Sequence, residues 1–341
     1  MSSARRMEVP WTREFVPLNG VTTHIVKCGY WLQTSTPTNR LLFLIIPGNP
    51  GVIQYYERFM ECLYWASEGE VPVWGVSHTG HVYDPSNLAK RSSPSQHESQ
   101  SSRPSTDSLN NGQHADEPFT LKGQINNKIE FINKHVPEDV RLILLGHSIG
   151  CYMILKMLDA LSPRRVFRCF LLFPTIERMA ASPNGTVATP LLRWLRWLAV
   201  GAAHSISFLS PRVKYRLVLW HFGANKTSNN IPECIYNATM EIFTPSCLAN
   251  VLFLANEEMQ QVDKLDADLV SRHADKLCLY YGQSDSWCPR EYFYNVRDRK
   301  LKCDIRLCNR GYEHAFVIKA SDEMADIVWG WFQSHNLEES S

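Results

Sequence analysis

Uninterrupted apolar runs alternate with amphipathic stretches along most of this chain. This pattern predicts strands at residues 22–28, 40–46, 71–77, 139–146, 168–174, 276–282 and 304–308. Apolar residues at helical spacing predict helices at residues 52–67, 119–136, 152–161 and about 322–333. Strands that alternate with helices and read as continuous apolar runs are typical of parallel sheets covered on both faces. The pattern therefore predicts an α/β fold with a mostly parallel central sheet and helices on both of its faces.

Two stretches break this alternation. Residues 92–113 contain almost no apolar side chain and cannot contribute to a core, which predicts a polar, disordered surface loop. Residues 174–274 are helical in character and rich in Leu, Trp and Arg. Because they lie between two predicted strands of one sheet, we interpret them as a helical cap inserted into a single domain that spans residues 1–341.

Composition narrows the function classes. The 341 residues carry 35 basic and 34 acidic side chains, a formal net charge of +1, which gives no electrostatic reason to expect nucleic acid as a partner. The 10 cysteines are scattered, with no CxxC pair, so we expect reduced cytosolic thiols, no metal site and no cofactor. The first residues, MSSARRMEVPWTREFVP, lack the apolar segment of a secretory signal, and none is expected.

The sequence LILLGHSIGC joins a predicted strand to a predicted helix through G-x-S-x-G. In that context the pentapeptide predicts a nucleophile elbow, with Ser148 at the tip of a sharp turn. Gly146 and Gly150 would remove side chains where strand and helix pack closely. The alternative is an ordinary strand-to-helix turn in which the serine only caps the helix.

A serine hydroxyl needs a base to take its proton. His314, in a loop after the last predicted strand, is our candidate, whereas the His147 side chain should point away from the serine. Asp285 follows the strand at 276–282 and could orient the imidazole. The resulting order Ser148, Asp285, His314 is that of α/β-hydrolases.

Other carboxylates remain alternatives to Asp285. Glu257 and Glu258 in the segment LANEEM could supply the acid. Asp304 is a weaker candidate because it lies inside its own predicted strand.

A tetrahedral intermediate also needs two donors for its oxyanion. The backbone N–H of Ile149, directly after the serine, is the first candidate. The loop after the strand at 40–46 reads PGNPG and offers the second. Pro50 has no N–H, so Asn49 is the expected donor, and Gly48 and Gly51 would let substrate approach the backbone. A simple Pro-Gly turn is the alternative interpretation.

Four motifs together, PGNPG, GHSIG, YYGQSDSWCP and GYEHAF, resemble the lipid droplet-associated hydrolase family of α/β-hydrolases over nearly the whole chain. The resemblance implies that Ser148 is the nucleophile, Asp285 the acid and His314 the base. It also implies an enzyme on the cytosolic face of lipid droplets and endoplasmic reticulum that acts on sterol esters. The polar stretch at 92–113 matches no motif of that family.

The segment 190–222 bears on the substrate. Pro190 is expected to begin a helix that Pro211 ends, but Arg193 and Arg196 interrupt its apolar character. Its tryptophans and basic residues suit a lipid–water boundary, so we predict a monotopic segment that lies on a lipid surface. The alternative is a helical cap that buries its apolar residues against the sheet.

The motifs and the resemblance together imply a serine ester hydrolase for apolar lipids, with a lipid ester as substrate and, from the resemblance, a droplet or reticulum surface as partner. A thioesterase or an acyltransferase would use the same triad. The alternative from another class is a structural or tethering protein of lipid droplets whose hydrolase activity is weak or vestigial.

Overall fold

In a computed structural model, the structure describes residues 9–30, 40–85, 118–223 and 231–339. The polar stretch predicted at 92–113 lies outside the described residues. The described part of the chain contains a sheet with the strand order β1-β2-β4-β3-β5-β6-β7-β8. Its strands are β1 (Trp11–Leu18), β2 (Val21–Cys28), β3 (Leu41–Ile46), β4 (Val73–Val76), β5 (Arg141–His147), β6 (Val166–Leu172), β7 (Leu277–Gly282) and β8 (Asp304–Cys308).

Neighbouring strands from β4 to β8 run parallel, whereas β2 is antiparallel to both β1 and β4. All residues of β6 and β7 are buried, including Arg168 of β6, and their otherwise apolar sequences are typical of strands covered on both faces. β1 was not predicted from the sequence. Among the described strands it pairs only with β2, at the sheet edge, and its buried and exposed positions do not form a clear apolar pattern.

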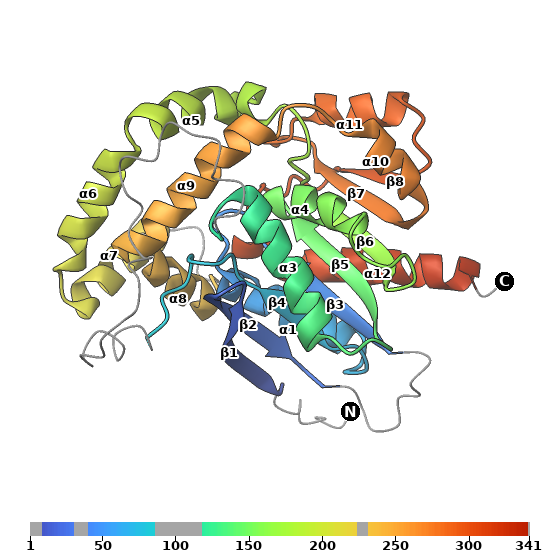
Figure 1. The fold of residues 1–341 in the computed structure, drawn as a ribbon, viewed down its shortest axis with the longest axis horizontal. Helices are drawn as coiled ribbons and strands as arrows, with labels where there is room; N and C mark the ends of the chain where they lie inside the picture. The colour runs from blue at the N-terminus through green and yellow to red at the C-terminus, as the bar shows by residue number, and fades with distance from the viewer. Residues whose placement is uncertain (1–8, 31–39, 86–117, 224–230, 340–341) are drawn as a thin grey trace.

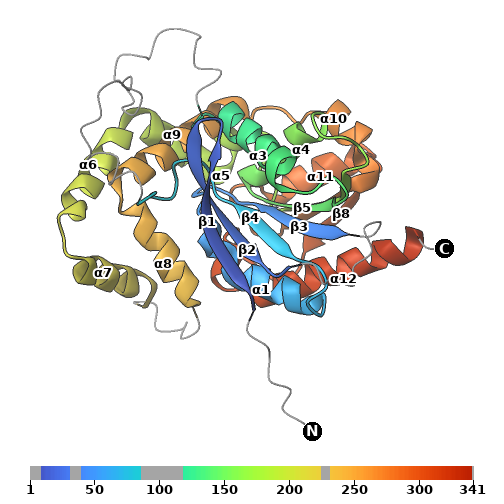
Figure 2. The ribbon, with the colours of Figure 1, turned by 60° about the horizontal axis from the view of Figure 1, so that its bottom comes forward.

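Helices cover both faces of the sheet. Apart from the helices between β6 and β7, they are α1 (Glu57–Ala66), α3 (Leu121–His135), α4 (Ile149–Leu158), α11 (Arg290–Asp298) and α12 (Ser321–Glu339). Helices α1 and α12 pack together on one face, and α3 and α4 lie on the other (Figure 2). Short 3₁₀ helices include η2 (Ile53–Tyr56) and η6 (Phe316–Ile318). The predicted mostly parallel sheet with helices on both faces is thus present.

The chain between β6 and β7 forms helices, most of which make a lobe beside the sheet (Figure 1). They are α5 (Pro183–Trp194), α6 (Arg196–Ser207), α7 (Pro211–Gly223), α8 (Glu233–Ile242), α9 (Pro245–Gln261) and α10 (Ala267–Arg272). Helix α9 packs against both α5 and α6.

The predicted helix start at Pro190 is wrong, whereas a helix does end shortly before Pro211, because α6 ends at Ser207. Pro190 lies inside α5, which begins at Pro183, and Pro211 is the first residue of α7. The earlier start has a local cause: the Ser182 hydroxyl accepts a hydrogen bond of 3.0 Å from the Gly185 amide, so that Ser182 is an N-cap followed by a proline at N1.

Among the described residues, no individual helix combines the length and apolar character of a membrane span. Helices α8 and α9 reach that length and character only as a pair, and they are bent by 89° at their junction.

Candidate active site

Ser148 occupies a strained turn between β5 and α4. Its φ of 54° and ψ of −123° are uncommon for any residue other than glycine. Glycines on both sides allow the packing that holds this conformation. A Cβ on Gly150 would lie 2.2 Å from the carbonyl oxygen of Ile46, and one on Gly146 would lie 2.9 Å from Cα of Cys151. The serine is therefore presented at the end of a buried strand by a tightly constrained backbone.

The side chains of Ser148, His314 and Asp285 form one hydrogen-bonded row. Nε2 of His314 lies 2.9 Å from Oγ of Ser148, and Nδ1 of the same ring lies 2.6 Å from Oδ2 of Asp285. With the Nδ1 proton donated to Asp285, Nε2 is free to accept the serine proton. These residues follow β5, β7 and β8, whose carboxyl ends meet at one edge of the sheet because the strands are parallel.

Asp285 is buried, and both of its carboxylate oxygens accept hydrogen bonds. Its Oδ1 accepts hydrogen bonds from the backbone amides of Trp287 at 2.7 Å and Cys288 at 3.1 Å. Burial acts to raise the pKa of this carboxyl, but the hydrogen bond and charge of His314, together with the two amides, outweigh burial and leave the pKa below its usual value. The arrangement can therefore keep a carboxylate beside the imidazole at neutral pH.

The PGNPG loop lies against the serine. β3 and β5 pair in register, with Ile46 opposite Gly146, so the loop that follows β3 adjoins the elbow. A Cβ on Gly48 would be 3.0 Å from Cβ of Ser148. The amide of Ile149 is the first of α4, a position at which no acceptor exists within the helix. Asn49 and Ile149 thus belong to the two backbone segments that flank Ser148, and their role as oxyanion donors stays a prediction.

A chain of buried hydrogen bonds, which the sequence did not predict, links this loop to the histidine. The Gly48 amide donates to the Tyr56 hydroxyl at 2.9 Å, and that hydroxyl donates to Nδ1 of His147 at 2.6 Å. Nε2 of His147 then donates to the carbonyl oxygen of His314 at 2.8 Å. Burial, with the nearby His314, lowers the pKa of His147 to about 3. His147 is therefore a neutral support for the loop that carries His314.

The carboxylates considered as alternatives to Asp285 make other contacts. Glu258 is buried and accepts a hydrogen bond of 2.9 Å from Nδ2 of Asn49. Glu257 accepts one from Gln261. Asp304 binds His335 at 3.0 Å, at the amino end of β8 and so at the sheet edge opposite the serine. In the described part of the chain, Asp285 is the carboxylate placed to orient His314.

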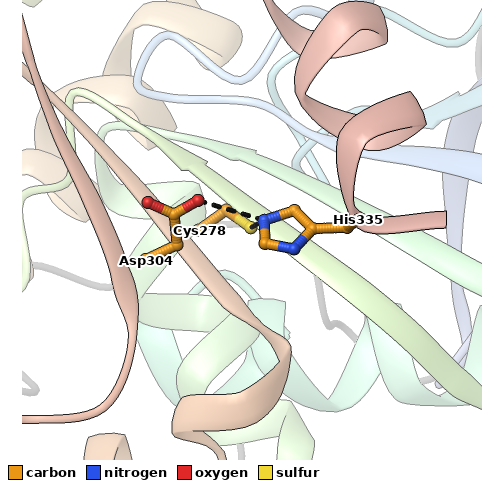
Figure 3. Close-up of side chains that lie close together, drawn as sticks. All are labelled: Cys278, Asp304 and His335. Atoms are coloured by element: carbon orange, nitrogen blue, oxygen red, sulfur yellow. Dashed lines mark hydrogen bonds and ion pairs between the residues drawn. The ribbon is translucent and has the colours of Figure 1, made fainter. Parts of the chain in front are cut away.

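Two groups of Cys, His and Asp side chains within the described ranges bring potential metal ligands within 4.8 Å of one another. One consists of Asp285, His314 and the neighbouring Cys288. The other consists of Cys278, Asp304 and His335, which join β7, β8 and α12 (Figure 3). The carboxylate of Asp304 already accepts hydrogen bonds from His335 and Trp331 and pairs with Arg306 at 3.3 Å. This network attaches the terminal helix to the sheet, and we assign it no ligand.

Comparisons with known proteins agree with this architecture. A family model described as "Lipid-droplet associated hydrolase" matches residues 39–317. The chain is 38% identical to a lipid droplet-associated hydrolase from Gallus gallus, over 98% of each chain. It is 37% identical to the protein of the same name from Homo sapiens, over 96% of this chain and 97% of the other.

Among solved structures, the peroxisomal α/β-hydrolase Lpx1 from Saccharomyces cerevisiae is similar, with a TM-score of 0.60 at 13% identity. The match covers 97% of this chain and 90% of that one. At such low identity the likeness concerns the fold alone. The expected α/β-hydrolase fold is confirmed.

Proposed function

Because the chain belongs to the family of lipid droplet-associated hydrolases, we propose that it is a serine ester hydrolase that cleaves apolar lipid esters, with sterol esters as substrates. The observation that supports this most directly is the hydrogen-bonded row of Ser148, His314 and Asp285. A nucleophile, a base in contact with it and an acid that orients the base are the parts that acyl transfer requires.

In the first half-reaction, Oγ of Ser148 attacks the ester carbonyl carbon while Nε2 of His314 takes the hydroxyl proton. Asp285 stabilises the imidazolium that forms. The tetrahedral intermediate collapses, the bond between the carbonyl carbon and the alkoxy oxygen breaks, and the imidazolium gives its proton to the departing alcohol. The fatty acyl group stays on Ser148 as an ester.

In the second half-reaction, His314 takes a proton from water, and the resulting hydroxide attacks the acyl-enzyme. The second intermediate collapses, Ser148 regains its proton from His314, and the fatty acid leaves. In both steps the carbonyl oxygen becomes an anion beside the amides of Ile149 and Asn49. Loss of one such donor typically raises the barrier by about 3–4 kcal/mol.

The surface of α5, α6 and α7 supports action at a lipid surface. It exposes large apolar side chains, with Trp194 at 65%, Trp197 at 66%, Phe208 at 79% and Trp220 at 72%. Soluble proteins rarely leave such a group of rings in water, and large exposed apolar patches mark sites of association. Burial of apolar area gains roughly 25 cal/mol per Å², so several of these side chains could anchor the protein by several kcal/mol.

The first turn of α5 lies close to the chemistry. The amide of Asn184, at the start of α5, donates a hydrogen bond of 3.0 Å to the carbonyl of Ser286, the residue after Asp285. We therefore propose that the chain sits on the cytosolic face of lipid droplets and endoplasmic reticulum, with α5–α7 as its monotopic contact. The names of its relatives support the droplet part of this proposal.

Aspartate at Leu191, Leu195 and Leu198 together should release the protein from droplets. These side chains are 43–49% exposed, so the substitutions remove apolar contact area and add three charges without opening the core. In a flotation assay with purified droplets, the bound fraction should fall at least about tenfold, because a charge at the acyl boundary costs several kcal/mol. Cleavage of a soluble ester should change much less.

A matched control places three aspartates at Gln261, Ser271 and Asn309, exposed positions outside α5–α7. This variant carries the same added charge and should float like the wild type. If the folded triple variant in α5–α6 also floats like the wild type, these helices form only a cap and the anchor lies elsewhere.

The proposed substrate class is tested with emulsions of cholesteryl oleate and of triolein, each incubated with purified protein. We expect release of oleate from cholesteryl oleate. Release of oleate from triolein but not from cholesteryl oleate would support the hydrolase activity and contradict the proposal that sterol esters are the substrates.

A second candidate function is a structural or tethering role on droplets. The exposed apolar surface of α5–α7 favours it, because this surface could hold the protein on a droplet without any turnover. Flotation with droplets, combined with no hydrolysis of any ester, would support that role.

A further inference from the structure

Building on the proposed function, we propose that Glu258 is a positioning residue: from cap helix α9 it fixes the side chain of Asn49, and through it the backbone segment that receives the oxyanion.

Both hydrogen-bond acceptors of the Asn49 amide group come from α9. Nδ2 donates to Oε1 of Glu258 at 2.9 Å and to the carbonyl oxygen of Val251 at 3.0 Å. These acceptors lie about two turns apart on α9, which places them along one side of the helix. The side chain of Asn49 is therefore held by hydrogen bonds to two turns of α9.

The neighbours of Asn49 are held from the other side. The amide of Gly48 donates to Tyr56, and the amide of Gly51 donates to Nδ1 of His81 at 2.9 Å. Tyr56 and His81 lie in segments that adjoin the sheet, before the cap begins in the sequence. The loop is thus tied to the core at both flanks and to the cap through its middle residue. Since α9 packs against α5 and α6, this tie joins the apolar surface of the cap to the oxyanion segment.

Burial of the Glu258 carboxyl group is energetically unfavourable unless the group forms hydrogen bonds. The residue is 2% exposed, and a buried carboxyl group needs hydrogen bonds to offset the loss of water. Burial raises its pKa to about 8, against the opposing effect of the Asn49 hydrogen bond, so the group is largely neutral at pH 7. An apolar residue would pack α9 at less cost but would leave the Asn49 amide without this acceptor.

The proposal is tested with the full chain, p-nitrophenyl butyrate as a soluble ester, and the variants Glu258→Ala, Glu258→Gln and Glu257→Ala. Glu258→Ala should lower kcat at least about tenfold with KM changed less than about twofold, because the oxyanion exists only in the transition state. Glu258→Gln keeps an acceptor oxygen and should stay within about threefold of the wild type. Glu257, the next residue on the same helix, bonds only Gln261 among the described contacts and serves as the matched control.

A double-mutant cycle separates positioning from general stability. Asn49→Ala keeps the backbone amide but removes the side chain that Glu258 holds, so it should lose as much kcat as Glu258→Ala. The double variant should lose no more than either single one. If Glu258→Ala does not fold, Asn49→Ala alone remains decisive.

Wild-type kcat in folded Glu258→Ala or in Asn49→Ala overturns the proposal. Equal kcat losses in the Ala and Gln variants at position 258 also overturn it, because the loss would then not follow the acceptor. A wild-type protein without Ser148-dependent turnover overturns the proposed function and this inference together. If the wild-type protein shows Ser148-dependent turnover but the kcat losses of Glu258→Ala and Asn49→Ala add in the double variant, the inference about Glu258 is wrong and the proposed function stands.

Discussion

Alanine at position 148 is expected to lower kcat for ester hydrolysis by about 10⁶-fold, down to the rate that binding and the oxyanion donors supply by themselves. The reason is geometric: Oγ of Ser148 is the atom that Nε2 of His314 contacts at 2.9 Å, and alanine has no atom there to attack the ester. His314→Ala should lose a similar factor, because nucleophile and base act as one unit. The measurement is steady-state turnover of p-nitrophenyl butyrate by purified variants.

The Ser148→Ala protein should remain folded. The substitution removes one oxygen atom, and a lost hydrogen bond of this kind changes the free energy of unfolding by about 1 kcal/mol. Ser205→Ala is a suitable control, because the Ser205 hydroxyl is exposed in the cap and bonds only the carbonyl of Gly201 among the described contacts. Wild-type turnover by Ser148→Ala would show that the nucleophile lies elsewhere.

Asparagine at position 285 is expected to lower kcat by about 10⁴-fold. Oδ1 of Asp285 accepts two backbone amides, so an asparagine must place its oxygen there and turn its NH₂ group toward Nδ1 of His314. The NH₂ group can only donate a hydrogen bond to Nδ1, whereas the carboxylate accepted one from it. The imidazole then carries its proton on Nε2, where it cannot take the proton of Ser148, and the imidazolium loses its counter-charge.

The same experiment decides between acids. Asp285→Asn should be compared with Glu257→Gln and Glu258→Gln, each expected to stay within about threefold of the wild type. Normal activity of Asp285→Asn together with a loss of several orders of magnitude in either glutamine variant would move the acid to α9.

The inner strands β3, β5, β6 and β7 were predictable because each is a mainly apolar run that is almost entirely buried. The elbow at Ser148 was predictable because Gly146, Ser148 and Gly150 lie close together in sequence. Both glycines are required there because a side chain would collide with the neighbouring backbone. His314 and Asp285 could be chosen because parallel strands deliver the loops that follow them to one edge of the sheet.

Features that depend on contacts between distant segments were not predictable in the same way. Tyr56 and His147 meet across 91 positions, and Asn49 and Glu258 across 209. No local pattern marks either pair, so Glu258 was read as a possible acid when its partner is the oxyanion loop. Edge strand β1 was missed because most of its side chains are exposed or only partly buried, which leaves little apolar pattern in its sequence. The predicted helix start at Pro190 was wrong because the helix begins earlier, with Ser182 as its N-cap residue.

The central claim is that Ser148 is an activated nucleophile, and covalent labelling tests it most directly. A fluorophosphonate probe phosphonylates a serine whose proton a neighbouring base removes, and digestion followed by mass spectrometry locates the modified residue. The account predicts stoichiometric modification of the peptide that contains Ser148, and none in Ser148→Ala. Absence of labelling in the folded wild-type protein, or labelling at another serine, would contradict it.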